Sequence, residues 1–390
     1  MASSIEAPAD GTLELSDVAL GVAGIRLGVA ASGTRYRNRN DLCLIELAPA
    51  SVTQCLFTTN RFCAAPVIVA RRHLAAAAPR YLVTNAGNAN AGTGEAGIAA
   101  ALQVCAAVAA ETACPLATVL PFSTGVIGQA LPAELLGAAV PALVADLRAD
   151  GWHDAAAAIM TTDTRVKLRS ARAGSDDLRF TVTGMAKGSG MIKPDMATML
   201  GYVATDAAVS PAGLQRLAVE VAGASFNRIT VDGDTSTNDA LAVIATGAAG
   251  NTPIEDDRSP GYAALRSALE AVCVGLAQDI VRDGEGATKF VTVRVAGGHN
   301  DSDCRRVAYA VAESPLVKTA LFASDANWGR ILAAVGRAGA DQLAIDEVDI
   351  DIGPCAIVRG GEPVPDYDEA PVARAMKAQD IDITIRIGQG

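Results

Sequence analysis

Short apolar runs alternate with Ala-rich stretches along the whole chain. The apolar runs, rich in Val, Ile and Leu, predict strands at 42–47, 66–70, 81–84, 118–120, 180–183, 198–204, 290–295, 348–352 and 381–387. The longer Ala-rich stretches predict helices at 97–111, 133–147, 212–222, 263–277 and 304–316. One helix start is well marked, because the Ser210 hydroxyl can cap free backbone N–H groups and Pro211 suits a first turn. Alternating strands and helices predict an α/β protein.

Composition narrows the kinds of partner that the protein can have. The chain has 390 residues, of which 50% are hydrophobic, and a net charge of −11. Such a chain can bury a large core, and its acidic balance argues against a nucleic-acid partner, since no basic surplus neutralises phosphates. The apolar stretches 98–110 and 155–160 are too short to span a membrane, and the first residues lack a secretory signal. We expect a cytoplasmic protein that acts on small molecules, without membrane or nucleic-acid partners.

Cysteine and histidine usage argues against several kinds of chemistry. The eight cysteines are scattered without a CxxC pair, which is typical of buried thiols in a reducing compartment. The three histidines lie far apart in the sequence, so no metal-binding motif is present and we expect no metal. Catalysis by a Ser-His-Asp or Cys-His arrangement is disfavoured for the same reason. If the protein is an acyl-transfer enzyme, we expect its base to be a group other than histidine.

Two Gly-rich loops after predicted strands hold candidate chemistry. Loop 85–94 lacks the spacing of a dinucleotide-binding turn, and a turn stabilised by Asn side chains is favoured. Loop 121–128 can present the Thr124 hydroxyl and the Gly125 N–H to one oxygen, as an oxyanion hole requires. The alternative for this second loop is a strand-turn glycine without a catalytic role.

The segment 187–200, KGSGMIKPDMATML, combines several unusual features. Its glycines permit close backbone approach to a ligand, and Pro194 fixes a turn. Thr198 follows the small residue Ala197 and opens an apolar strand. This position suits a nucleophile, but threonine at a strand start is also ordinary, because β-branched residues favour strands. The pattern alone leaves both interpretations open.

This segment resembles the signature of the ornithine acetyltransferase (glutamate N-acetyltransferase) family, whose members cleave themselves at an Ala-Thr bond. Further segments agree in the family's order, at 60–67, 84–94, 123–128, 159–164, 231–239, 283–291 and 314–336. The resemblance spans nearly the whole chain. It implies a layered α/β sandwich of the self-processing ornithine acetyltransferase type, with a main domain at 1–280 and a smaller C-terminal α/β domain at 281–390.

The resemblance also implies a mechanism. The Thr198 hydroxyl would attack the Ala197 carbonyl, and hydrolysis of the resulting ester would give an alpha chain, 1–197, and a beta chain, 198–390. The new α-amino group of Thr198 has an ordinary pKa of about 7.7 to 8.0, so it could serve as the base. Thr198 would then carry an acetyl group from N2-acetylornithine to glutamate. The family implies no cofactor, with acetyl-CoA as an optional second acetyl donor.

Further site residues follow from matching positions in the family's motifs. Thr124 and Gly125 match the oxyanion positions. The implied substrate-binding residues are Thr161, Thr162, Lys187, Thr198 and Glu285, of which Thr161 and Thr162 are alternatives for one contact. A lysine suits the α-carboxylate of both substrates, and a glutamate suits the side-chain amine of ornithine. We interpret the acidic loop with Asp232, Asp234 and Asp239 as structural support, since it lacks the order of a calcium loop.

Two departures from the family and two alternative functions remain. Residue 195 is Asp where many relatives have Asn, and the chain is expected to end before a stretch whose Asn contacts substrate in relatives. A self-processing amidohydrolase or aminopeptidase would pass the acyl group to water instead of glutamate. An inactive, C-terminally truncated relative is the other alternative. We expect the alpha and beta chains to stay together, as a heterotetramer of two of each or a larger assembly.

Overall fold

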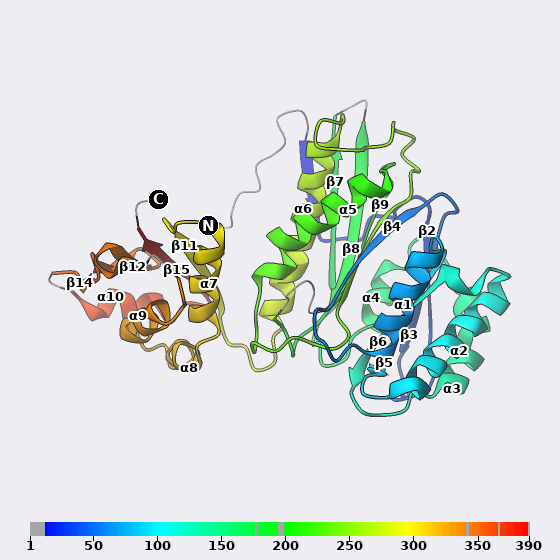
Figure 1. Ribbon diagram of the computed structural model, residues 1–390, viewed down its shortest axis with the longest axis horizontal. Coiled ribbons are helices and arrows are strands. Elements are labelled where there is room, and N and C mark those ends of the chain that lie inside the picture. Colours follow the sequence, from blue (N-terminus) through cyan, green and yellow to red (C-terminus); the bar gives the residue numbers. More distant parts are fainter. Residues whose placement is uncertain (1–11, 176–177, 194–198, 341–342, 366, 389–390) are drawn as a thin grey trace. The chain divides into compact units, whose positions relative to one another are not determined.

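The computed structural model describes residues 12–175, 178–193, 199–340, 343–365 and 367–388 (Figure 1). They form two compact units. The larger unit ends at Gly284 and leaves out Thr230–Gly233, which belong with the smaller unit from Glu285 onward. The sequence predicts the boundary after residue 280, which is a position in the last turn of helix α6 (Tyr262–Arg282), whereas the larger unit extends to Gly284.

The larger unit contains two sheets that face each other. The six-stranded sheet has the order β1 (Thr12–Ser16), β7 (Lys167–Gly174), β8 (Arg179–Lys187), β9 (Leu200–Thr205), β10 (Ala240–Ala245) and β4 (Val52–Phe57). The four-stranded sheet has the order β2 (Ile25–Ala30), β3 (Leu42–Leu47), β5 (Tyr81–Asn88) and β6 (Val119–Val126). Only the pairs β9 with β10 and β5 with β6 are parallel among the pairings described in these two sheets.

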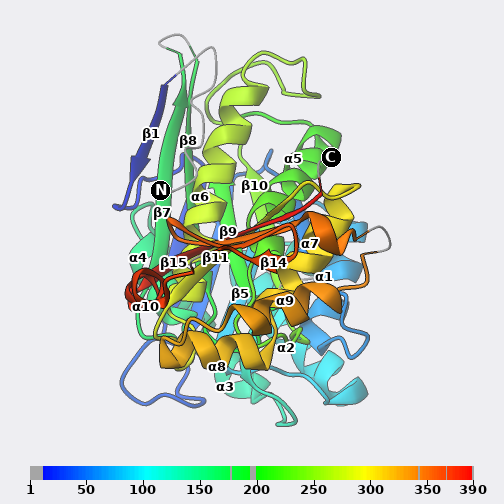
Figure 2. The same cartoon turned by 90° about the vertical axis from the view of Figure 1, so that its left-hand side faces the viewer.

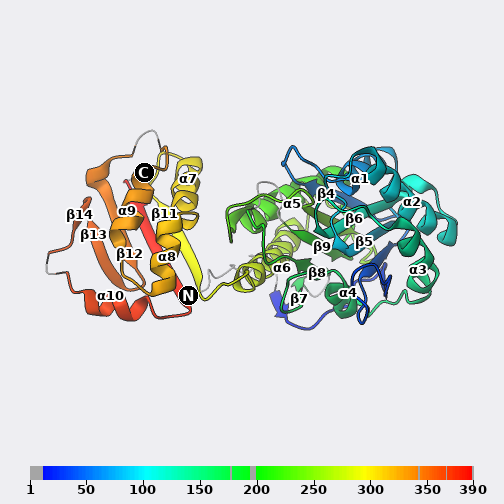
Figure 3. The same cartoon turned by 90° about the horizontal axis from the view of Figure 1, so that it is seen from below.

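Helices cover the outer faces of both sheets, as Figure 3 shows. The covering helices are α1 (Ala65–Ala76), α2 (Gly94–Thr112) and α3 (Ala133–Ala145) on the four-stranded side, and α5 (Pro211–Ala224) and α6 on the six-stranded side. The short helix α4 (Trp152–Ala158) packs against strands of both sheets. The result is a four-layered sandwich, which confirms the predicted layered α/β class.

Side chains that alternate along the strands fill the space between the two sheets. Leu200, Tyr202 and Ala204 of β9 point into this core, where they meet Leu82 and Phe122 of the opposite sheet. The rings of Phe122 and Tyr202 meet edge to face, with centroids 5.4 Å apart. Such apolar faces stabilise the pairing of the sheets because burial removes both from water.

The smaller unit is a second α/β layer structure (Figure 2). Its sheet has the order β11 (Phe290–Ala296), β15 (Asp380–Ile387), β12 (Val348–Ile352), β13 (Cys355–Arg359) and β14 (Glu362–Pro363). Its helices are α7 (Asp301–Ala312), α8 (Pro315–Ala323), α9 (Trp328–Gly336) and α10 (Glu369–Ala375). Every second residue of β15, from Ile381 to Ile387, is buried in a core shared with these helices. The remaining short helices are 3-10 turns at Leu116–Thr118, Phe226–Arg228 and Ile345–Glu347.

Some predicted elements are wrong. The strand predicted at 66–70 lies in α1, because a short apolar run does not distinguish a strand from a buried helix and Pro66 suits the first turn. The helix predicted at 304–316 is split into α7 and α8, where Ser314 caps the second helix through the Val317 N–H. The loop predicted at 121–128 is mostly strand β6. The predicted cap at Ser210 is confirmed, since its hydroxyl accepts a hydrogen bond from the Gly213 N–H.

Helix α2 is longer than the apolar stretch that the sequence indicated. By length and composition alone, it is the one helix among the described residues that could cross a membrane. In the structure its residues Val104, Cys105 and Val108 pack into the core beside the four-stranded sheet. This is the environment of a covering helix in a layered α/β unit.

A hydroxyl pair between the sheets gives a test of this packing. Thr84 Oγ1 and Tyr202 Oη lie 2.7 Å apart and are buried. Tyr202→Phe leaves the Thr84 hydroxyl without this partner, so we expect the free energy of unfolding to fall by about 1–3 kcal/mol. The double variant with Thr84→Val should recover part of the loss, as measured by urea unfolding. Equal stability of the single variant and the wild type would contradict a structural role for this hydrogen bond.

Candidate active site

The end of β8 places Lys187 beside a buried carboxylate. The Asp163 side chain accepts hydrogen bonds from Lys167 Nζ at 2.6 Å and from the Gly188 N–H at 2.7 Å, both on Oδ1. Burial raises the pKa of Asp163, but the positive charges of Lys187 and Lys167 and these hydrogen bonds outweigh it, so the net pKa is lowered. Asp163 is therefore ionised at neutral pH.

The loop between α4 and β7 carries the two candidate threonines. The Thr161 N–H donates to Asp163 Oδ2 at 3.0 Å. The Thr162 hydroxyl lies 2.6 Å from the hydroxyl of Ser189, in the turn that follows Lys187. The structure thus brings Thr161 and Thr162 to the same turn as Lys187, as a shared substrate contact would require.

Asp239 is a second buried carboxyl near Lys187. It directly precedes β10 and is 3% exposed, and the next residue donates its N–H to the Met199 carbonyl at 2.8 Å. Oδ2 of Asp239 has no hydrogen-bond partner in the part of the chain that the structure describes. Burial raises the pKa of Asp239 well above its ordinary range, opposed by hydrogen bonding to Ser236 and by the charge of Lys187. The same lysine thus acts on one ionised carboxylate and one carboxyl held toward its neutral form.

Thr124 and Gly125 lie in the last residues of β6. Gly125 has φ 131°, and a Cβ atom there would lie 2.2 Å from the carbonyl carbon of Gly87 in β5. Only glycine fits at this close approach of two backbones. Asn238, the neighbour of Asp239, donates its Nδ2 to the Ser123 carbonyl at 2.9 Å. This bond connects the end of β6 in one sheet with the start of β10 in the other.

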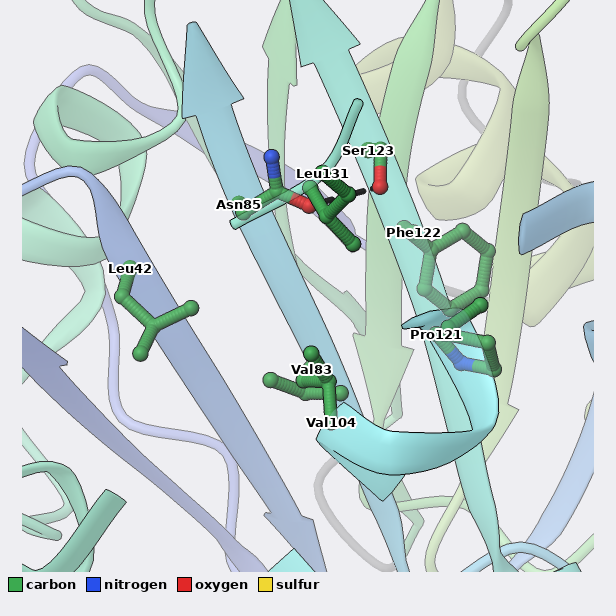
Figure 4. Close-up of a pocket in the computed structure, with 9 residues that line it drawn as sticks. Leu42, Val83, Asn85, Val104, Pro121, Phe122, Ser123 and Leu131 are labelled. Carbon is green, nitrogen blue, oxygen red and sulfur yellow. Dashed lines mark hydrogen bonds between the residues drawn. The ribbon is translucent and has the colours of Figure 1, made fainter. Parts of the chain in front are cut away.

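Behind Thr124, a buried polar pair supports the strand end. The Ser123 hydroxyl donates to Oδ1 of Asn85 at 2.6 Å, and Figure 4 shows the two side chains pointing toward each other. They border a small cavity that is otherwise lined by Leu42, Val83, Ala101, Val104, Pro121, Phe122 and Leu131. This lining is almost entirely apolar, so we interpret the cavity as a gap in core packing. The expected Asn-stabilised turn is confirmed directly after β5, where the Asn90 N–H donates to Oδ1 of Asn88 at 2.8 Å and Asn90 Nδ2 donates to the Gly97 carbonyl at 2.9 Å.

Of the remaining predicted site residues, the structure describes only Glu285. Ala197 and Thr198 lie outside the described residues, as does Asp195. Glu285 is the first residue of the smaller unit after the boundary and is exposed there. Among the residues that the structure describes, no group of three or more His, Cys, Asp or Glu is placed to hold a metal ion. All eight cysteines are free thiols.

Sequence reasoning missed the charged residues behind the site. Asp163 and Asp283 stand inside motifs that the sequence had indicated, at 159–164 and 283–291. Lys167 follows Val166 and precedes Leu168, and its side chain is fully buried between the two carboxylates. An acidic residue directly beside candidate hydroxyls was the available signal. Nothing in the spacing shows that Lys167 points inward.

The layered α/β unit and its strand-end cluster of hydroxyls, carboxyls and two lysines suit an enzyme of the acyl-transfer class. The model of the ArgJ family matches residues 26–390. The chain therefore belongs to the ArgJ family, and it is an acetyltransferase of arginine biosynthesis.

Individual relatives agree with this family. The chain is 51% identical to the arginine biosynthesis bifunctional protein ArgJ of Psychrobacter arcticus (strain DSM 17307 / VKM B-2377 / 273-4), over 97% of this chain and 93% of the relative. It is 50% identical to the protein of the same name from Pseudomonas fluorescens (strain Pf0-1), over 95% of this chain and 91% of that relative.

Two solved structures each match 48% of this chain. ArgJ of Bacillus halodurans matches over 99% of its chain, with 30% identity and a TM-score of 0.43. Ornithine acetyltransferase of Mycobacterium tuberculosis, complexed with ornithine, matches over 100%, with 36% identity and a TM-score of 0.44.

The two carboxyls near Lys187 predict opposite dependences on pH. The raised pKa of Asp239 means that unfolding releases its proton between pH ~4 and the folded pKa, so stability falls as pH rises. The side chain of Asn does not ionise, so Asp239→Asn lacks this dependence on pH. The free energy of unfolding of the wild type relative to this variant should therefore decrease with rising pH by up to about 1.4 kcal/mol per pH unit. Urea unfolding of both proteins from pH 5 to pH 8 measures the difference.

Asp163→Asn is the matched control, because the pKa of Asp163 is lowered. Its ionised form contributes stability that is present above the unfolded pKa of about 3.9 and is lost as pH falls through the folded pKa. From pH 5 to pH 8 we therefore expect this substitution to have a constant cost. A cost of Asp239→Asn that is equally constant would contradict the environment described for Asp239.

Proposed function

We propose that this chain transfers the acetyl group of N2-acetylornithine to glutamate through an ester on Thr198, after it cleaves itself between Ala197 and Thr198. One observation carries the proposal. The segment that contains Ala197 and Thr198 leaves β8 at Lys187 and reaches β9 after Met199. The Met199 carbonyl accepts a hydrogen bond from the N–H of Ala240, the residue after Asp239. Both ends of this segment are thus fixed within the cluster of hydroxyls, carboxyls and lysine.

The cleavage step needs a nucleophile, a stabilised oxyanion and water. Oγ of Thr198 attacks the Ala197 carbonyl carbon, the C–N bond breaks, and the nitrogen takes up the proton as the free α-amino group. Water then hydrolyses the ester and leaves Thr198 as a new N-terminus. The Thr124 hydroxyl and the Gly125 N–H would stabilise the oxyanion, and the loss of one such donor costs about 3–4 kcal/mol in other enzymes.

The transfer step uses the same atoms. Oγ of Thr198 passes its proton to its own α-amino group and attacks the acetyl carbonyl of N2-acetylornithine, and ornithine leaves with that proton. The amine of glutamate then attacks the acetyl ester, which forms N-acetylglutamate and returns the proton to Thr198. An amine with an ordinary pKa near neutrality can serve as the base in both directions, so no histidine is needed.

Substrate binding would involve Lys187, Thr161 or Thr162, and Glu285. The loop with Thr161 and Thr162 meets the turn that follows Lys187. The Thr162 hydroxyl lies 2.6 Å from the Ser189 hydroxyl, and Asp163 accepts a hydrogen bond from the Gly188 N–H at 2.7 Å. This meeting supports a role for the Lys187 ammonium in binding the α-carboxylate that both substrates share. Glu285 would bind the cationic side-chain amine of ornithine.

A second reaction belongs to the same proposal. The relatives are named bifunctional proteins, which supports acetyl-CoA as a second acetyl donor to glutamate without any resident cofactor. The amount of N-acetylglutamate formed from acetyl-CoA and glutamate measures this reaction.

We also propose that the cleaved alpha and beta chains assemble in the cytoplasm as a heterotetramer or a larger assembly. Light scattering of the purified protein measures the size of the assembly.

Intact-mass analysis tests the cleavage. We expect the wild type to give two fragments, 1–197 and 198–390, which elute together under native conditions. Thr198→Ala lacks the nucleophile, so it should give one uncleaved chain without acetyl transfer, whereas Thr198→Ser should retain cleavage. An uncleaved wild type that still transfers acetyl groups would rule out the mechanism.

The identity of the acceptor needs its own measurement. With N2-acetylornithine and glutamate present, we expect N-acetylglutamate to form much faster than free acetate. Faster release of acetate would indicate the hydrolytic alternative, in which water accepts the acetyl group. Complete cleavage with neither product would indicate an inactive relative.

A further inference from the structure

Lys167 is a buried cation held between two carboxylates. Its Nζ lies 2.6 Å from Oδ1 of Asp163 and 2.6 Å from Oδ2 of Asp283, and its side chain is 0% exposed. Taking such charges out of water costs free energy that their mutual attraction often fails to recover. Net stability is therefore a weak explanation for this arrangement, and the segments that it connects provide a stronger one.

Each carboxylate also binds the backbone of a segment near the site. Asp163 accepts from the N–H groups of Thr161 and Gly188, at 3.0 and 2.7 Å. Asp283, at the C-terminal end of α6, accepts from the Thr164 N–H at 3.0 Å and from the Thr164 hydroxyl. Lys167 thus joins three segments, which are the loop 161–164, the turn after Lys187 and the end of α6.

We propose that Lys167, Asp163 and Asp283 form a positioning centre that sets the substrate-binding loop 161–164 against the turn after Lys187. The proposal rests on the proposed function, since it assigns these residues to substrate binding in that reaction. The three residues act through the groups that they hold.

A neighbouring ion pair offers a matched control. Arg169 of β7 binds Asp279 of α6 through Nε at 2.8 Å and through Nη2 at 2.9 Å. This pair joins the same two elements as Lys167 and Asp283. Within the described part of the chain, the side-chain hydrogen bonds of this pair do not involve the hydroxyls or N–H groups of Thr161, Thr162 or Gly188. If the Lys167 centre only held β7 against α6, loss of either pair would have the same effect on the reaction.

The experiment uses full-length variants with mild changes. Thr164→Val removes one hydroxyl bond to Asp283 and keeps all charges, and Thr164→Ser restores that hydroxyl. We expect Thr164→Val and Asp283→Asn to be cleaved completely and to raise the KM for N2-acetylornithine about three- to tenfold, the range for one lost hydrogen bond. Their kcat should stay within about twofold of wild type, since ground-state binding is lost uniformly.

The control variants separate positioning from general stability. Thr164→Ser should match the wild type, and Asp279→Asn should lower thermal stability without raising KM. Wild-type KM in both Thr164→Val and Asp283→Asn, or an equal rise in Asp279→Asn, would overturn the positioning role alone. A wild type that is neither cleaved nor active would instead overturn the proposed function, and intact mass distinguishes the two failures.

Discussion

The face-to-face packing of the two sheets in the larger unit is the constraint on which the candidate site depends. Tyr202 and Phe122 meet across this core, and the hydroxyl of Tyr202 bonds to Thr84 of the opposite sheet. Because the sheets are held at this separation, Asn238 can bridge from the start of β10 to the carbonyl of Ser123 at the end of β6. The oxyanion candidates and the charged cluster come from different sheets, so neither sheet alone contains the site.

Burial then gives the charged groups different states. Asp163 and Asp239 are both buried and both lie within reach of the charge on Lys187. Asp163 has additional donors in Lys167 and the Gly188 N–H, so its pKa is lowered. Among the described residues Asp239 has hydrogen bonding to Ser236 but no second cation, and its pKa is raised by burial. The number of donors, and not depth alone, decides which carboxyl keeps its charge.

The sequence predicts the elements and caps that depend on local pattern, but it does not predict the residue roles that depend on tertiary contacts. The bounds of β3 and β12 and the cap at Ser210 follow from apolar runs and cap chemistry. The segment 66–70 was wrong because a buried helix next to a sheet is as apolar as a strand. Lys187, Thr124 and Gly125 could be named from motifs. Lys167 could not, because its role depends on carboxylates that lie 4 and 116 positions away.

Strand order explains how a cut inside the core could leave the molecule intact. Cleavage at 197/198 would break the covalent connection between β8 and β9, which are antiparallel neighbours in the six-stranded sheet. In the order β1, β7, β8, β9, β10, β4, the two strands of the second fragment lie between strands of the first. Two hydrogen-bonded ladders, β8 with β9 and β10 with β4, would therefore still join the fragments. Only one covalent bond would be lost, while the buried faces of both sheets would stay in contact, so the new N-terminus would be released within an unchanged frame.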